Sequence, residues 1–387
     1  MKRHTFSKII ASRLLAAGFL ASLLTACLSP SGLRSEGEVR QPTMVERMGG
    51  SFHPKANALQ TDALSLWHDA APAKRALVDY VKRVTAKDSP DFIPPSARIA
   101  VFDFDGTLFA ETDPVYIEWL VFTDRVLDAP DYRDKATKEE IALAREIRAA
   151  AKTKNLSDDM EKRHARMNTQ VYKGMTLAGF RDYVRRYVQA DAPGYTGMKR
   201  GEAYYRPMLQ VIDYLLAHDF IVYVCSGSNR NLLRALLDGV VPVPPRQIIG
   251  SDSTITARGQ GETDGLDYMY AHDDELILGG RLLVKNVKMN KASAIAREIG
   301  AQPVLSFGNS SGDASMANYV ITNNPYKALA FMLLCDDTER EYGVPSEAEK
   351  MRASSEENGW IPVSMRDDWK TIYGEGVRKR REAPSRE

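Results

Sequence analysis

The sequence is poor in the residues that build thiolate metal sites or disulfide frameworks, and it carries no excess of one charge. Only three cysteines and six histidines occur among 387 residues, and their spacing does not indicate a zinc site. Lysine and arginine number 52 against 51 aspartates and glutamates, so the basic surplus of nucleic-acid-binding proteins is missing. No internal repeat is present, and the composition is typical of a globular protein. Nucleic acid is therefore not an expected partner.

The first residues have the pattern of a secretory signal. Lys2, Arg3 and Lys8 precede a mostly apolar stretch, Ile9–Leu24, which is too short and too poorly flanked to favour a transmembrane helix. We therefore expect residues 1–26 to be removed from the mature protein.

The end of this signal, Leu24-Thr25-Ala26-Cys27, resembles the cleavage site of bacterial lipoproteins. The resemblance implies cleavage before Cys27, a diacylglyceryl group on its sulfur, and an acyl chain such as palmitate on the new amino terminus. Several acyl chains give stable anchoring to a membrane. Leu28, in place of an acidic residue, favours the outer membrane, facing the periplasm. The alternative is an ordinary secreted protein with a chance cysteine at this position.

Two further cysteines, Cys225 and Cys335, would mature in an oxidising compartment. A disulfide between them is one option there. The other option is that Cys225, which ends an apolar stretch, is a small buried apolar residue.

The hydrophobic pattern divides the remaining chain into a tether and an α/β core. Residues 27–56 are rich in Ser, Gly, Pro and charge, as in a flexible tether. Apolar stretches at 98–104, 220–225 and 303–307 predict strands, and helical patterns lie between them. Alternation of strands and helices predicts a doubly wound parallel sheet.

An insertion follows the first predicted strand. Residues 109–205 have a helical, charge-rich pattern, and this is too long for a plain crossover connection. We expect an inserted helical cap domain over this range, with residues 57–108 and 206–387 forming the core.

Two carboxylates end the first predicted strand, within Val101–Leu108. Ligands of parallel α/β sheets bind outside the carboxyl ends of the strands. Asp103 and Asp105 therefore stand where a substrate would lie, followed by a Gly-Thr break. A plain strand-end turn is the alternative.

Three further polar motifs follow in order. Ser226-Gly227 ends the second predicted strand, where Ser226 could also cap the next helix. Lys291 lies near the start of a predicted helix over 291–299, with Lys288 as a competitor. The loop Gly308–Asp313 follows the third predicted strand.

Together these motifs resemble the four motifs of the haloacid dehalogenase superfamily, and the cap position resembles its phosphoserine phosphatase-like branch. The resemblance implies a phosphatase in which Asp103 attacks phosphorus and Asp105 acts as the general acid and base. It implies that Ser226 and Gly227 bind the phosphate and that Lys291 contributes a fixed positive charge.

The resemblance also implies a Mg²⁺ cofactor, bound by Asp103, the backbone carbonyl of Asp105, Asn309 and Asp313. The family more often has Asp where this chain has Asn309. An amide oxygen can bind the cation but adds no charge, so we expect a weaker metal site.

The expected substrate is a small phosphate ester outside the cytoplasm. Glu111 is the candidate for binding a substrate amine, with Arg230 for a second anionic group. Trp119, Tyr116 and Tyr172 are candidates for stacking on the substrate. Two alternatives remain open: a phosphotransferase using the same aspartyl-phosphate, and a non-catalytic lipoprotein that binds metal or phosphate.

Overall fold

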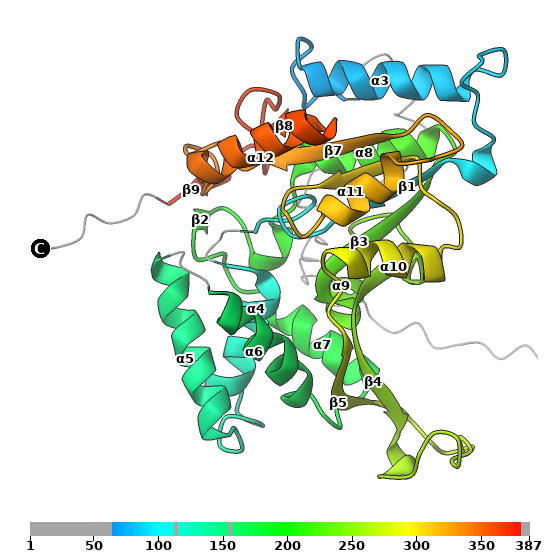
Figure 1. The fold of residues 1–387 in the computed structure, drawn as a ribbon. Helices are drawn as coiled ribbons and strands as arrows, with labels where there is room; N and C mark the ends of the chain where they lie inside the picture. The colour runs from blue at the N-terminus through cyan, green and yellow to red at the C-terminus, as the bar shows by residue number, and fades with distance from the viewer. Residues whose placement is uncertain (1–63, 112–114, 154–156, 381–387) are drawn as a thin grey trace, which may run out of the picture. The chain divides into compact units, whose positions relative to one another are not determined.

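The described part of the protein begins after the predicted signal and tether. The computed structural model describes residues 64–111, 115–153 and 157–380 (Figure 1). The predicted lipidation site Cys27 and residues 27–56 lie outside this range. Across the described ranges, no helix has both the length and the apolar character needed to span a bilayer.

A seven-stranded sheet runs in the order β5-β4-β3-β1-β6-β7-β8. Every neighbouring pair is parallel except β4 and β5. The strands of the sheet are β1 (Ile99–Phe102), β3 (Ile221–Asn229), β4 (Ile248–Ala257), β5 (Leu276–Val284), β6 (Leu305–Gly308), β7 (Leu329–Leu334) and β8 (Ile361–Ser364). The predicted α/β class is confirmed, and β1, β3 and β6 correspond to the three predicted strands.

Helices cover both faces of this sheet (Figure 1). These helices are α3 (Pro72–Thr85), α8 (Arg206–Ala217), α9 (Arg230–Leu237), α10 (Met289–Glu298), α11 (Ala314–Ile321) and α12 (Pro345–Asn358). Successive side chains of a strand point to opposite faces, yet Val101 and Phe102 of β1 are both fully buried. Val101 packs in a cluster with Ile295 of α10, whereas Phe102 belongs to the large core that contains Met208 of α8. The central strand is therefore covered on both sides, as in a doubly wound sheet.

Four helices lie in the chain between β1 and α8, where the sequence predicts an insertion. They are α4 (Ile117–Leu127), α5 (Lys138–Thr153), α6 (Asp158–Gln170) and α7 (Leu177–Tyr187). Ser157 and Thr176 begin α6 and α7, because the side chain of each accepts a hydrogen bond from a backbone N–H group. The short strands β2 (Tyr195–Thr196) and β9 (Arg378–Lys379) pair with each other.

The sequence patterns do not reveal the long antiparallel hairpin β4–β5, which runs beside these inserted helices (Figure 1). The backbone N–H of Gly174 donates to the Leu278 carbonyl, and the Leu278 N–H donates to the Met175 carbonyl. Thr169 Oγ1 also donates to the carbonyl of Gly280 at 3.0 Å. The hairpin therefore ties the sheet to the inserted helices.

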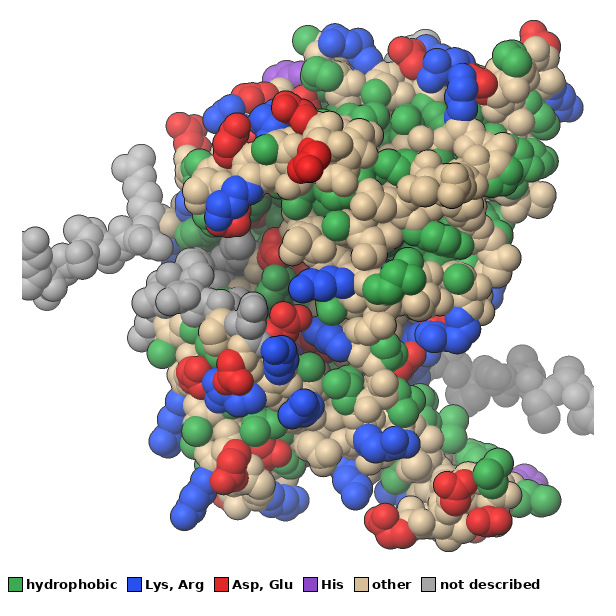
Figure 2. Space-filling view, in the orientation of Figure 1, with side chains coloured by type: hydrophobic (Ala, Val, Ile, Leu, Met, Phe, Trp, Pro, Cys, Tyr) green, Lys and Arg blue, Asp and Glu red, His purple; other side chains and the backbone are tan. Residues whose placement is uncertain are grey.

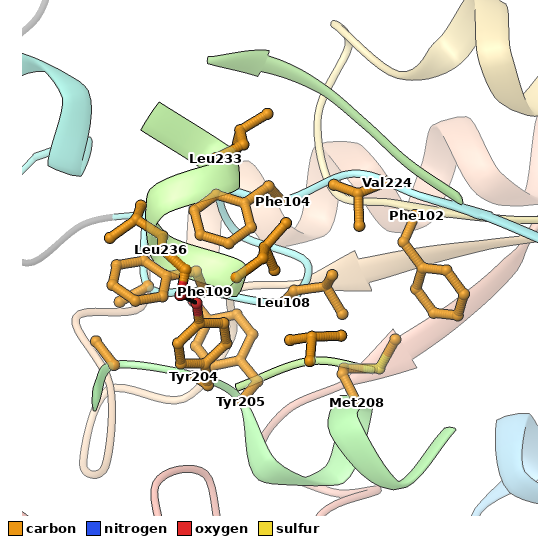
Figure 3. Packing of buried hydrophobic residues seen from close by; sticks show 14 of the residues in the cluster. Phe102, Phe104, Leu108, Phe109, Tyr204, Tyr205, Met208, Val224, Leu233 and Leu236 are labelled. Carbon is orange, nitrogen blue, oxygen red and sulfur yellow. Dashed lines mark hydrogen bonds between the residues drawn. The ribbon is translucent and has the colours of Figure 1, made fainter. Parts of the chain in front are cut away.

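An aromatic cluster fixes the loop that follows β1 (Figure 3). Phe104 stacks on Phe109 with ring centroids 5.1 Å apart, and Tyr204 meets both rings edge-on. The Tyr204 hydroxyl donates to the Leu236 carbonyl at 2.8 Å. Because Phe104 is fully buried between Asp103 and Asp105, the two carboxylates are held on a rigid support.

The two cysteines of the described chain, Cys225 and Cys335, do not form a disulfide. Cys225 is fully buried in the cluster around Val101. Of the two options that the sequence leaves open for Cys225, the small buried apolar residue is therefore the one that the structure shows.

Candidate active site

One cavity of about 620 Å³ lies at the carboxyl ends of β1, β3 and β6. Its floor is formed by the loops after β1 and β6, by the last residues of β3 and by the start of α10. Its roof is formed by α4, α6 and the end of β5. The predicted site residues that line it are Asp103, Asp105, Glu111, Ser226, Gly227, Lys291 and Asp313. Figure 2 shows acidic and basic side chains gathered in the hollow between the sheet and the inserted helices.

A buried ion cluster occupies the floor. Lys291 Nζ lies 2.5 Å from Asp103 Oδ1 and 2.5 Å from Asp313 Oδ1. Burial alone lowers the pKa of Lys291, but the two carboxylates raise it above its usual value, so the lysine stays protonated. Burial and the nearby Asp313 raise the pKa of Asp103 to about 7, although Lys291 opposes this. One lysine shared by two carboxylates leaves the cluster short of positive charge.

Lys291, and not Lys288, contacts the carboxylates. Lys291 is only 2% exposed in the first turn of α10, as the predicted helix over 291–299 suggests. Lys288 lies on the cavity wall with an exposed side chain and a φ of 54°, a conformation that costs energy in a residue with a Cβ.

The loop Gly308–Asp313, which we call the acidic loop, folds around Asp313. Asp313 Oδ2 accepts hydrogen bonds from the backbone N–H groups of Asn309 and Ser310, both at 3.1 Å. A Cβ on Gly308 would lie 2.6 Å from that of Asp313, so only glycine fits there. The glycine and the final aspartate of this loop therefore act together, leaving Asp313 Oδ1 for Lys291.

Asp105 has a partner that the sequence analysis missed. Ser228 Oγ donates to Asp105 Oδ2 at 2.6 Å. Burial raises the pKa of Asp105 to about 7, against the lowering effect of this hydrogen bond. Asp105 Oδ1 is buried and has no hydrogen-bond partner within the described ranges. The alternation of side chains in Ser226-Gly227-Ser228 was the available signal, because it places both serines on one side of an extended strand.

Ser226 is fully buried and does not cap α9. Its Oγ accepts the backbone N–H of Ser228 at 3.1 Å, while the cap of α9 is Asn229. The alternative that Ser226 is an N-cap is therefore wrong. The Gly227 carbonyl accepts a hydrogen bond from Lys285 Nζ at 2.9 Å, which brings a second unpredicted residue to the cavity wall.

Glu111 faces the acidic loop. Its Oε1 accepts the Tyr116 hydroxyl at 2.8 Å, and its Oε2 accepts Asn309 Nδ2 at 2.6 Å. Burial raises the pKa of Glu111 to about 7, and both hydrogen bonds oppose that rise.

Of the other residues expected to contact the substrate, two line the cavity and two do not. Trp119 and Tyr116 line the cavity. Arg230 does not; it is held by Asp252 and Glu298 at 2.6 Å each. Tyr172 packs on Phe180 inside the inserted helices. The structure thus places Arg230 and Tyr172 away from the cavity that they were expected to line.

The floor offers oxygen ligands of the kind that Mg²⁺ prefers in the carboxylates of Asp103 and Asp313. The other expected ligands are the backbone carbonyl of Asp105 and the amide of Asn309. Asn309 does not line the cavity itself, but its amide contacts Glu111, which does. In the described ranges, no three His, Cys, Asp or Glu side chains are grouped to hold a metal, so the expected site needs the carbonyl and the amide as well. The unpartnered Asp105 Oδ1 and the single buried lysine among these carboxylates fit a site that takes a cation.

One family model covers the part of the chain that carries these motifs. The model of the family described as haloacid dehalogenase-like hydrolase matches residues 100–318, more than half of the chain. No curated protein matches the sequence.

Several solved structures are similar at low identity. A protein of unknown function from Anaerococcus prevotii is 13% identical with a TM-score of 0.44, over 76% of this chain and 91% of its own. Cytosolic 5′-nucleotidase IIIB bound to cytidine is 13% identical with a TM-score of 0.43, over 77% and 87%. A phosphoserine phosphohydrolase-like protein from Francisella tularensis is 13% identical with a TM-score of 0.35, over 66% and 92%. At these TM-scores the resemblance carries no argument about substrate.

Proposed function

Because the chain belongs to the haloacid dehalogenase-like hydrolases, we propose that it is a Mg²⁺-dependent phosphomonoesterase of small phosphate esters. The observation that carries the proposal is the buried cluster of Asp103, Lys291 and Asp313 beside Asp105, at the bottom of a cavity. Catalysis of phosphoryl transfer consists largely of positioning and charge neutralisation, which such a cluster supplies.

Asp103 is the nucleophile in this mechanism. Its carboxylate oxygen bonds to phosphorus as the bond from phosphorus to the ester oxygen breaks, and Asp105 gives its proton to the departing oxygen. Water then attacks the phosphorus of the aspartyl-phosphate, Asp105 takes back a proton, and phosphate leaves with Asp103 regenerated. The raised pKa of Asp105 suits a group that must both give and accept a proton near neutral pH.

The remaining floor residues bind the phosphate. Ser226 and the backbone of Gly227 hold its oxygens, and Lys291 neutralises part of its charge. Asp103, the Asp105 carbonyl, Asn309 and Asp313 would hold Mg²⁺, which screens the phosphate from the attacking carboxylate.

The test is hydrolysis of a panel of phosphate esters by the full chain in detergent, with Mg²⁺ and with a chelator. We expect metal-dependent phosphate release that Asp103→Asn lowers by at least about a thousandfold, since the nucleophile is lost. Phosphate appearing on an added alcohol instead of free in solution would make the protein a phosphotransferase. Metal binding without turnover of any ester would contradict the enzyme assignment.

We further propose that a lipid on Cys27 anchors the enzyme in a bacterial cell envelope, at the outer membrane facing the periplasm. The sequence Leu24–Cys27 supports this. Labelled palmitate should enter the wild-type protein and not Cys27→Ala, and equal labelling of both would remove the anchor from the proposal.

A further inference from the structure

Glu111 is expected from the sequence to bind a substrate amine, but its contacts point elsewhere. Its two carboxylate oxygens accept from Tyr116 at 2.8 Å and from Asn309 Nδ2 at 2.6 Å. A substrate ammonium would have to displace or share these bonds. The shortest hydrogen bond of Glu111 is therefore with the acidic loop of the catalytic floor.

This pair lies directly on the turn after Asp105. Gly106 has a φ of 76°, and a Cβ there would lie 2.0 Å from Asn309 Nδ2 and 2.6 Å from Glu111 Oε2. The left-handed glycine thus creates the space that Glu111 and Asn309 fill. The preceding residue, Asp105, supplies the backbone carbonyl of the proposed metal site and carries the buried, unpartnered Oδ1.

The hydrogen bond also fixes which end of the Asn309 amide faces which neighbour. In its ionised form Glu111 only accepts hydrogen bonds, so the Asn309 NH₂ faces it, as the contact from Nδ2 to Oε2 shows. The Asn309 oxygen is at the opposite end and accepts a long hydrogen bond from Thr107 Oγ1 at 3.5 Å. Glu111 supplies a negative charge, and Asn309 supplies an oriented neutral oxygen. Together they have the two properties that a single aspartate in the acidic loop would have.

We propose that Glu111 is a positioning residue of the metal site, which orients the Asn309 amide as a ligand and supplies the charge that Asn309 lacks. The inference rests on the proposed function for the identity of the cation. Carboxylates that orient metal ligands typically affect metal affinity by about 10–100-fold. A change at Glu111 should therefore affect the reaction of every substrate, not only of those that carry an amine.

The experiment measures Mg²⁺ affinity of the full chain by calorimetry, and Mn²⁺ affinity by electron paramagnetic resonance. Glu111→Gln should weaken both by at least about tenfold. Glu161→Gln is the matched charge control, because Glu161 lines the same cavity and has an exposed side chain on α6. It should change affinity by less than about twofold, since exposed charges are well screened.

A reciprocal exchange separates this role from simple packing. In Glu111→Gln/Asn309→Asp the carboxylate and the amide trade places across the same hydrogen bond. The amide at position 111 then donates, and the carboxylate at position 309 accepts. We expect the double variant to bind Mg²⁺ within about threefold of wild type, although each side chain is changed, because the total charge and the hydrogen bond are both retained. Thermal unfolding without metal checks that the variants are folded.

Two results would overturn the inference. One is a Glu111→Gln variant with wild-type metal affinity whose KM rises for phosphoethanolamine but not for glycerol phosphate, which would make Glu111 a substrate-amine ligand. The other is a double variant that is folded and as weak as Glu111→Gln. If the wild-type protein binds Mg²⁺ and hydrolyses esters in either case, the proposed function stands and only this inference falls.

Discussion

The floor and the roof of the cavity are built on different principles. On the floor, Lys291 contacts two buried carboxylates and Ser228 contacts a third. On the roof, Lys162 and Arg166 are exposed on α6 and form no ion pair within the described residues. Groups that contact one another before substrate arrives are preorganised for chemistry, whereas unpaired cations on a helix can adapt to different ligands. The floor is therefore suited to the proposed chemistry, and the α6 side of the roof is suited to choosing the substrate.

The largest difference between floor and roof is expected when the charge that holds the floor together is removed. Lys291→Met should lower the free energy of unfolding by about 3–5 kcal/mol, because two buried carboxylates lose their shared partner. Lys288→Met, on the same cavity wall but exposed, should change it by less than about 0.5 kcal/mol. Urea unfolding of both variants measures the difference, and equal destabilisation would contradict the described floor.

A smaller effect is expected at Ser228, because its hydroxyl tunes Asp105 without holding the floor together. The hydrogen bond stabilises the ionised carboxylate and so lowers the pKa of Asp105. Ser228→Ala should raise that pKa by roughly one unit, given about 1.5 kcal/mol for a hydrogen bond to a charged group. Since the first step needs protonated Asp105, the basic limb of the pH profile of kcat/KM should move upward. An unmoved or lowered limb would argue against Asp105 as the acid.

The smallest effect is expected on the roof. Lys162→Ala and Arg166→Ala should each lower kcat/KM by about threefold for esters with a second anionic group, because exposed charges interact weakly through solvent. Esters with neutral leaving groups should be unaffected, and added salt should abolish the difference. A loss of similar size for every ester would instead assign these residues to the floor's chemistry.

The sequence predicts the floor of the cavity better than its roof. Asp103, Asp105, Ser226 and Asp313 end or follow apolar strands, so the edge of the sheet where they meet could be foreseen. Lys291 could be placed near them because it starts a helix, although Lys288 competed with it. Such predictions use only local pattern and the geometry of parallel sheets.

The contacts of the roof could not be foreseen, because they depend on elements whose pattern is weak. Strand β5 is an antiparallel edge strand with exposed Leu276 and Leu283, and Gly279, Gly280 and Arg281 interrupt its apolar run. The contacts of Glu111 could not be foreseen either, because they depend on a turn and on a residue far along the chain. Its direction is set by the left-handed turn at Gly106 and by Asn309, which lies 198 residues later in the chain.

The central position of β1 has a consequence for how the protein acquires activity. β1 pairs with β3 and β6, which follow it only after more than a hundred residues of other structure. Bringing such distant segments together costs loop entropy, and proteins rich in long-range pairings fold slowly. During synthesis the strand that carries Asp103 must wait, apolar on both faces, until residues near 229 and then 308 have been made. The floor is complete only once Asp313 has joined it, so newly made chains spend a period with the proposed nucleophile present and the site incomplete.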